Sequence, residues 1–318
     1  MPPRPMSTLP SRRNFLTKSA LGLAVAVLAS RSASAAHHKS GGHNHDDTWF
    51  DISLAQWSLN KDFWSGKRDK MRFAEITKRE FGVNAVEYVN QFYLEGFNQS
   101  VTKELKKVSD GEGVNNVLIM CDKCGRLGDP DAKKQDWSVE THIPWLEAAQ
   151  TLGCHAIRVN AHSEKTESYG TQLDRTADGL RRVCEIGDTY GLHVIVEPHG
   201  GLSSNGAWLV ALMDLVGHPR VGMLPDFGNY GSEREGWTYD IYRGTAQSMP
   251  YAKGVSAKTF HFDANGEEDT MDFRRLMQIV KESGFTGFVD IEYEGHDIDP
   301  DTGIKLTRDL LVKLGGRL

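Results

Sequence analysis

The sequence contains few cysteines and few prolines, and it has no long hydrophobic run. Its 318 residues include 4 Cys and 11 Pro, which excludes a small disulfide-stabilised fold and a collagen-like chain. The main apolar run, residues 20–29, is too short to span a bilayer. With 39% hydrophobic and 25% charged residues, the composition is that of a globular protein.

An excess of basic residues is also missing from most of the chain. The formal net charge is −6, and the first 35 residues hold five basic and no acidic side chains, so the remainder carries −11. Nucleic acids and anionic membranes select positively charged surfaces. We therefore expect no nucleic-acid partner and no stable membrane association of the mature protein.

The N-terminal residues form a targeting pattern. Arg12 and Arg13 precede the apolar run, and the small-residue motif Ala-Ser-Ala ends at residue 35. This pattern resembles the twin-arginine (Tat) export signal. The resemblance implies a signal peptide over residues 1–35, the Tat machinery as a partner, and a periplasmic or otherwise exported protein. An uncleaved N-terminal anchor is the alternative.

A short polar segment follows at residues 36–47. It contains four histidines, His37, His38, His43 and His45, among Gly, Ser and Asp. Histidines in such a segment can collect metal ions, but a tract without apolar residues is typical of a flexible linker. We expect a linker.

The remaining residues, 48–318, alternate short apolar segments with amphipathic ones. Several predicted helices run into a glycine before the next strand, as at Gly82 and Gly153, which is typical of repeated βα units. Eight units in one domain predict a (β/α)8 TIM barrel. An open doubly wound sheet is the alternative, but no Gly-x-Gly-x-x-Gly motif follows the first strand. The predicted strands are 52–57, 85–89, 116–120, 156–160, 193–197, 221–226, 254–260 and 287–292, and the predicted helices are 67–81, 102–110, 137–152, 173–190, 205–216, 239–251, 271–283 and 303–314.

Carboxylates stand where three of the predicted strands end. They are Glu197, Asp226 and Glu292, and the carboxyl ends of the strands form the functional face of a parallel barrel. Three carboxylates that converge repel one another unless a cation lies between them. The pattern therefore predicts a divalent metal site, although salt bridges or, for Asp226, a turn would also account for single residues.

Four motifs make the chain similar to a known family. They are Val-Glu-Pro-His-Gly-Gly at 196–201, Pro-Asp-Phe-Gly-Asn at 225–229, Val-Ser-Ala-Lys at 255–258 and Ile-Glu-Tyr-Glu at 291–294. Together they resemble the sugar phosphate isomerase/epimerase family of xylose isomerase-like TIM barrels. The resemblance implies one divalent ion (Mn, Co, Mg or Zn) on Glu197, Asp226 and Glu292.

The chain departs from that family at the fourth ligand. The resemblance implies a histidine on the seventh strand, where this sequence has Ser256. His199, His261 and Lys258 are the candidate substitutes. We rank His199 first because side chains two residues apart on a strand face the same way.

The remaining site residues follow from the same geometry. Glu197 and Glu292 are the expected acid–base pair, because they lie on opposite sides of the barrel axis. Polar residues elsewhere at the rim are candidates for substrate binding, with structural hydrogen bonds as the alternative. These candidates are Arg158, Asn160, Lys258, Glu87 and Asn229.

This pattern favours a metal-dependent sugar isomerase or epimerase that works through an enediolate. We expect an unphosphorylated keto-sugar or sugar derivative as substrate, because the acidic loop at 263–269 would repel a phosphate. Two alternatives are a 3-keto-glycoside lyase that acts by β-elimination and a non-catalytic exported sugar-binding barrel. The oligomeric state stays open, a homo-oligomer included.

Overall fold

The computed structural model of the protein describes residues 48–231 and 239–316. The expected signal peptide (1–35) and linker (36–47) lie outside the described residues. The eight strands of the expected barrel are all present and parallel. They are β1 (Asp51–Ala55), β2 (Ala85–Val89), β3 (Asn115–Cys121), β4 (Ala156–Val159), β5 (His193–Val196), β6 (Val221–Met223), β7 (Val255–Thr259) and β8 (Phe288–Tyr293).

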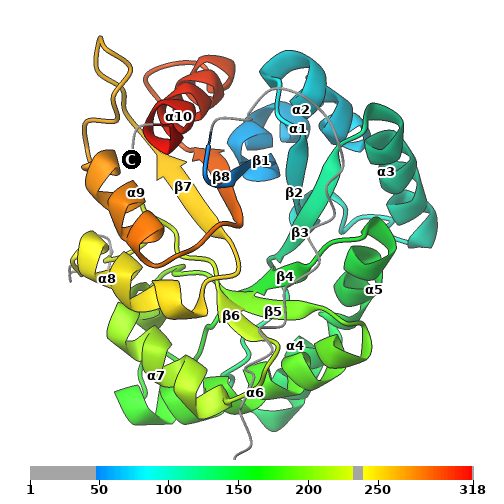
Figure 1. The fold of residues 1–318 in the computed structure, drawn as a ribbon. Helices are drawn as coiled ribbons and strands as arrows, with labels where there is room; N and C mark the ends of the chain where they lie inside the picture. Colours follow the sequence, from blue (N-terminus) through cyan, green and yellow to red (C-terminus); the bar gives the residue numbers. More distant parts are fainter. Residues whose placement is uncertain (1–47, 232–238, 317–318) are drawn as a thin grey trace, which may run out of the picture. The chain divides into compact units, whose positions relative to one another are not determined.

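The strands form one sheet in the order β6-β5-β4-β3-β2-β1-β8-β7. Between β6 and β7 the ring is completed by two single bridges, Met223 to Ala252 and Asp226 to Ser256. The Ser256 amide donates to the Pro225 carbonyl at 2.8 Å. Figure 1 shows the strands arranged around a centre, with helices outside them. This arrangement confirms the predicted eight-stranded α/β barrel.

The helices follow the strands in the predicted rhythm. Gly82 and Gly153 end α2 and α5 in the left-handed conformation, at φ 68° and 82°, as glycine does at helix C-termini. The helices are α1 (Asn60–Ser65), α2 (Phe73–Phe81), α3 (Gln99–Glu112), α4 (Ala132–Glu140), α5 (Ile143–Leu152), α6 (Tyr169–Thr189), α7 (Gly206–Val216), α8 (Ile241–Ser248), α9 (Phe273–Glu282) and α10 (Pro300–Gly315).

One predicted helix is divided in the structure. Residues 137–152 fall into the end of α4 and the whole of α5, with Thr141 and His142 between them. Pro144 explains the division, since proline has no N–H and fits only the first turn of a helix. A new helix therefore begins at Ile143.

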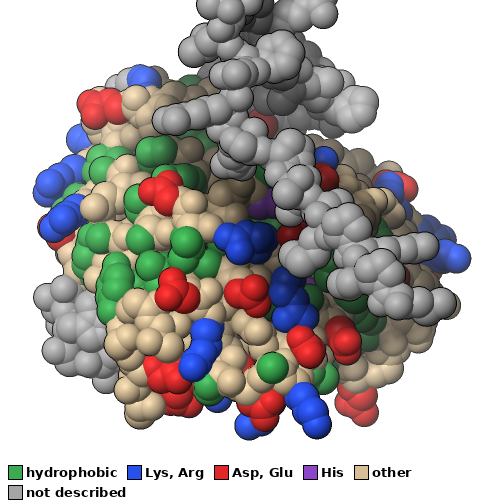
Figure 2. Space-filling model, turned by 90° about the horizontal axis from the view of Figure 1, so that it is seen from below, with side chains coloured by type: hydrophobic (Ala, Val, Ile, Leu, Met, Phe, Trp, Pro, Cys, Tyr) green, Lys and Arg blue, Asp and Glu red, His purple; other side chains and the backbone are tan. Residues whose placement is uncertain are grey.

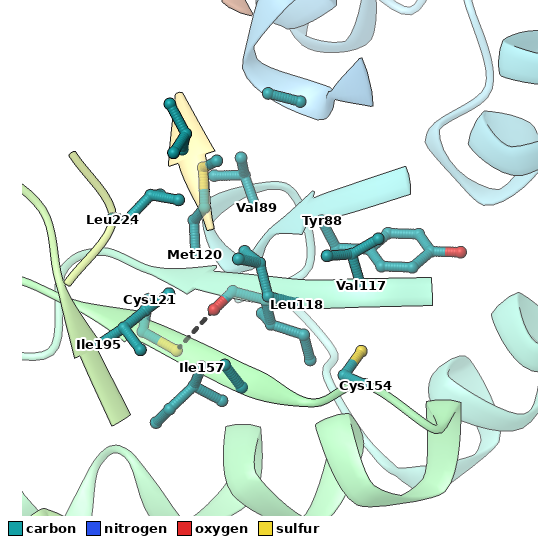
Figure 3. Packing of buried hydrophobic residues seen from close by; sticks show 14 of the residues in the cluster. Tyr88, Val89, Val117, Leu118, Met120, Cys121, Cys154, Ile157, Ile195 and Leu224 are labelled. Atoms are coloured by element: carbon teal, nitrogen blue, oxygen red, sulfur yellow. Dashed lines mark hydrogen bonds between the residues drawn. The ribbon is translucent and has the colours of Figure 1, made fainter. Parts of the chain in front are cut away.

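Apolar side chains fill both the barrel wall and part of its interior. Figure 3 shows Leu118, Met120, Ile195 and Leu224 packed from β3, β5 and the end of β6, and all four are 3% exposed or less. Burial of this kind contributes about 25 cal/mol for each Å² of apolar surface. The buried apolar cluster includes residues of β1, β2, β7 and β8 as well, such as Leu54, Val86, Ala257 and Ile291.

The outer surface carries charges of both signs. Figure 2 shows acidic and basic side chains interspersed on one face of the molecule. Among the described residues, no helix combines the length and the apolar character needed to cross a membrane.

Candidate active site

Three carboxylates meet at the carboxyl ends of the strands. Glu197 directly follows β5, Asp226 follows β6, and Glu292 lies in β8. One oxygen of each lies within 4.8 Å of the others, and the three residues are 2%, 0% and 4% exposed. The structure thus brings together the three residues whose position at strand ends predicted a metal site.

Asp226 is held by its own loop. Its Oδ1 accepts a hydrogen bond from the amide of Gly228 at 2.7 Å, so the carboxylate forms the Asx turn considered for it. Its Oδ2 lies 3.1 Å from Lys258 Nζ. Burial raises the pKa of Asp226 well above its usual range, and the charges of Glu292 and Glu197 add to the effect.

Glu197 belongs to what we call the Arg158 cluster: Arg158, Asp122, Asn160, Glu197 and Asn229. Arg158 Nε lies 2.7 Å from Glu197 Oε2, and its NH1 donates to Asp122 Oδ1 at 2.8 Å. Asn229 donates to Glu197 Oε1 at 2.9 Å, and Asn160 donates to Asp122 Oδ1 at 2.8 Å.

The Arg158 cluster keeps its carboxylates ionised. Burial by itself raises the pKa of Glu197 and of Asp122, but the nearby positive charges, that of the Arg158 guanidinium foremost, together more than offset this, and the pKa of each carboxyl is lowered. Arg158 in turn has a raised pKa, because these two carboxylates outweigh the effect of its burial.

Glu292 belongs to what we call the Lys258 cluster: Lys258, Asp226, Glu292, Glu294 and Ser256. Lys258 Nζ lies 3.3 Å from Glu292 Oε2 and 3.2 Å from Glu294 Oε1. Ser256 Oγ donates to Glu292 Oε2 at 3.1 Å. The residue at the position of the expected fourth ligand is therefore a hydrogen-bond donor to one of the three carboxylates.

Glu87 lies deeper in the barrel than the other candidates. Its Oε1 accepts from Ser53 Oγ at 2.7 Å, and the buried carboxyl of Asp290 is a neighbouring acidic group. Burial raises the pKa of Glu87 to about 7 and that of Asp290 well above its usual value.

His199 is not part of the carboxylate group. Its side chain is exposed, and its backbone carbonyl lies 3.0 Å from His162 Nε2. Both histidines line a cavity of about 400 Å³ over the ends of β4 and β5, a volume in the range of small-molecule sites. Its other lining residues include Arg126, Lys165, Gln172 and Leu202.

Sequence analysis did not identify three members of this network. Asp122 and Asp290 were not considered, and Glu294 appeared only within a motif. Asp122 directly follows β3, so the argument from strand ends would have found it. Asp290 and Glu294 lie two residues on either side of Glu292, and the alternation of β8 indicates that all three face inward.

The sequence matches a known protein family. Residues 78–314 match the family model described as "Xylose isomerase-like TIM barrel". The chain belongs to the xylose isomerase-like TIM barrel family. This membership confirms the predicted fold and the coarser part of the resemblance.

Solved structures of similar fold include sugar epimerases. D-psicose 3-epimerase from Clostridium cellulolyticum H10 superimposes with a TM-score of 0.67 at 13% identity, covering 85% of this chain and 100% of that one. The 3-keto-D-glucoside 4-epimerase from E. coli gives 0.62 at 16%, covering 83% and 99%. The IOLI protein, solved with a zinc atom, gives 0.67 at 13%, covering 84% and 99%. At 13% to 16% identity, these similarities show only that the fold is shared with this xylose isomerase-like barrel.

One curated relative matches part of the sequence. The C-glycoside deglycosidase alpha subunit of Microbacterium trichothecenolyticum is 38% identical over 80 residues, which are 25% of this chain. The matched segment is 20% of that relative's own length.

Proposed function

We propose that this xylose isomerase-like barrel is a metal-dependent isomerase or epimerase of an unphosphorylated keto-sugar or sugar derivative. The observation that carries the proposal is the convergence of Glu197, Asp226 and Glu292 in a buried group at the mouth of the barrel. Buried carboxylates that face one another in a cleft are typical of functional sites.

The donor set suits a divalent cation. Carboxylate oxygens are the ligands that Mg²⁺ and Mn²⁺ prefer, whereas Zn²⁺ is more often held by His or Cys. With Ser256 in place of a histidine, the three carboxylates form an all-oxygen set, which favours Mg²⁺ or Mn²⁺ among the metals expected. When bound, such an ion would supply positive charge beside the oxygens of a hydroxy-ketone and so ease loss of the proton between them.

Two carboxylates of this chain are proposed to move the proton. Glu197 lies after β5 and Glu292 in β8, so a sugar bound over the three carboxylates would present its reacting carbon between them. One removes the C–H proton to give an enediolate, and the other returns a proton. Return on the opposite face of the same carbon gives an epimer, and return to the neighbouring carbon gives an isomer.

Arg158, Asn160 and Asn229 hold these groups in place. Arg158 and Asn229 fix the two oxygens of Glu197, which keeps that carboxylate ionised and able to accept a proton. We propose that Asn160, which is partly exposed, contacts sugar hydroxyls. Glu87 lies among Ser53 and Asp290, and we propose for it a supporting role below the substrate.

An unphosphorylated substrate agrees with the charges at the rim after β7 and β8. Helix α10 begins at the cap Asp299 and has Asp301 in its first turn. A helix N-terminus would otherwise attract a phosphate, but these acidic residues oppose one. The hairpin between Phe262 and Glu268 adds Asp263 and Glu267.

A 3-keto-glycoside lyase is the second candidate, and the C-glycoside deglycosidase subunit similarity favours it. The reaction would begin with the same proton abstraction and continue with loss of the group at the β-carbon. The cavity lined by His162 and His199, over the ends of β4 and β5, offers space for such a leaving group.

Solvent hydrogen exchange tests both candidates. Purified full-length protein is incubated with Mn²⁺ or Mg²⁺ in D₂O and a panel of keto-pentoses, keto-hexoses and 3-keto-glucosides, and the products are identified by NMR. An isomerase or epimerase incorporates deuterium and yields a stereoisomer or isomer, whereas a lyase releases an aglycone. Absence of both from every sugar, while binding is seen by thermal shift, would contradict an enzymatic function and support a sugar-binding barrel.

Export through the twin-arginine route is proposed on the motif at Arg12 and Arg13. The first 47 residues fused to a reporter protein are expected to direct it across the membrane, and replacing both arginines by lysine is expected to retain it inside. Equal export of the two fusions would contradict the proposal.

A further inference from the structure

A protein cation lies on the proposed metal ligands. Lys258 is 3% exposed, and its ammonium is 3.1 Å from Asp226 Oδ2 and 3.3 Å from Glu292 Oε2. These are two of the three carboxylates that would hold the metal. A divalent ion on the same oxygens would lie close to the ammonium, and like charges at short range repel strongly in buried surroundings.

The position of Lys258 beside Asp226 and Glu292 follows from the strand pairing and from the space beside its stem. Lys258 is paired with Glu292 in the β7–β8 ladder, and it lies two residues after Ser256, so both face the interior. Gly228 leaves space for its stem: a Cβ there would lie 2.8 Å from Lys258 Cδ. Gly228 is thus required for close approach of the lysine to Asp226.

Lys258 also has a partner outside the three carboxylates. Its ammonium is 3.2 Å from Glu294 Oε1, and the Glu294 side chain is 31% exposed. A lysine stem has four rotatable bonds, so the ammonium can leave Asp226 and Glu292 and keep Glu294. Lys258 can therefore compete with a metal ion at Asp226 and Glu292, and Glu294 offers its ammonium a second position.

We propose that Lys258 is a built-in counter-cation that competes with the divalent metal, and that Glu294 receives its ammonium when the metal binds. The inference rests on the metal dependence in the proposed function, and it adds a role for Lys258 and Glu294 in metal binding. Metal binding then exchanges one cation for another at Asp226 and Glu292, and the protein stays folded with either.

The first test is Mn²⁺ affinity, measured by calorimetry and by electron paramagnetic resonance of free Mn²⁺. The full-length chain carries alanine at His37, His38, His43 and His45 in every variant, so that the N-terminal histidines do not contribute. Lys258→Met is expected to bind Mn²⁺ at least tenfold more tightly than the parent. Lys305→Met, at an exposed lysine of α10, is the matched control and is expected to leave the affinity unchanged.

The second test separates displacement from the mere presence of a nearby charge. Glu294→Gln is expected to weaken Mn²⁺ binding about threefold or more in the parent and to have little effect in Lys258→Met. Independent through-space effects of two charges would add, whereas displacement couples them in a double-mutant cycle. Should Lys258→Met not fold, Lys258→Gln replaces it, and Glu294→Gln in the parent still tests the second position.

Thermal unfolding supplies a further readout. Without metal, Lys258→Met leaves Asp226 and Glu292 without their cation, so its melting temperature is expected to fall below that of the parent and to recover with Mn²⁺ more than the parent gains. Equal Mn²⁺ affinity of parent and Lys258→Met would overturn the inference, as would an equal effect of Glu294→Gln in both backgrounds.

Failure of the inference is distinguishable from failure of the proposed function. Tighter binding by Lys258→Met without deuterium exchange in any sugar would leave the inference standing and contradict the function. Deuterium exchange together with equal affinities would do the opposite. Absence of Mn²⁺ binding in both proteins would overturn the inference and the metal dependence together.

Discussion

The Arg158 cluster and the Lys258 cluster are both largely buried, yet the pKa of Asp226 shifts in the opposite direction from those of Asp122 and Glu197. In the Arg158 cluster, two carboxylates share one guanidinium and receive amide donors from Asn160 and Asn229, and both have lowered pKa values. In the Lys258 cluster, three carboxylates share one ammonium, and the pKa of Asp226 is raised.

The difference teaches that burial alone does not decide the charge of an interior carboxyl group. Desolvation favours the neutral acid in both clusters, and the supply of cations and N–H donors decides the outcome. This supply is sufficient at Asp122 and Glu197, whereas at Asp226 it does not offset burial. A deficit of positive charge of this kind is what a metal ion would correct.

The largest expected effect comes from removing, in each cluster, the carboxylate proposed to transfer the proton. Glu197→Gln and Glu292→Gln are each expected to lower deuterium uptake by the sugar substrate about 10²–10⁴-fold, the usual contribution of a positioned acid or base. Glu185→Gln, at an exposed position of α6, is the control. Retention of more than a tenth of the exchange rate in Glu292→Gln would assign the proton transfer elsewhere.

Replacing Arg158 tests how far the charge balance of the Arg158 cluster depends on this one residue. Arg158→Met is expected to lower the free energy of unfolding by about 3–5 kcal/mol, because two buried carboxylates lose their partner. Arg182→Met breaks an exposed pair with Asp136 and should cost at most about 1 kcal/mol. Urea denaturation measures both, and similar small losses would mean that Arg158 is not a structural counter-ion.

The pH dependence of stability tests the buried carboxyl group of Glu87. The pKa of Glu87 is about 7 in the folded protein against 4.5 as the ordinary value, so its contribution to stability is complete below pH 4.5 and is lost as the pH rises through 7. The loss amounts to about 3 kcal/mol at most.

Glu87→Gln removes that titration. Its free energy of unfolding should change less than that of the parent between pH 5 and 8, as measured by urea denaturation at each pH. Parallel curves for the two proteins would show that Glu87 does not titrate in this range.

The smallest expected effect tests the amide donors that distinguish the Arg158 cluster. Asn229→Ala removes one hydrogen bond to Glu197 and is expected to cost about 1–2 kcal/mol in unfolding free energy, since the acceptor is charged and buried. Its pH–rate profile should shift upward on the acidic limb, because Glu197 becomes easier to protonate. An unchanged profile would show that Arg158 alone keeps Glu197 ionised.

The strands and the three central carboxylates were predictable from the sequence because both depend on short-range patterns. Apolar alternation and glycine at helix ends identify βα units, and parallel strands bring their carboxyl ends to one face. The grouping of Glu197, Asp226 and Glu292 follows from their positions at the ends of strands. The division between α4 and α5 could also have been predicted, since Pro144 was visible.

The pairing of charges was not predictable. That Arg158 reaches both Asp122 and Glu197, and that Lys258 lies on Asp226, depends on side-chain rotamers and on the register between strands. The proximity of Glu87 and Asp290 depends on β2 and β8 lying on either side of β1 in the sheet. The sequence indicates which residues face inward, whereas their neighbours are set by the closed ring.

The seam between β6 and β7 has a consequence for motion. Two isolated bridges join these strands, and Asp226 is in one of them, while Glu197 and Glu292 adjoin or belong to continuous ladders. Segments with few ladder bonds open first in native-state hydrogen exchange. Among the three proposed ligands, we therefore expect the backbone of Asp226 to adjust most if a cation enters. The amide of Phe227, bonded to Ser256 across the seam, is the reporter whose exchange rate should record that adjustment.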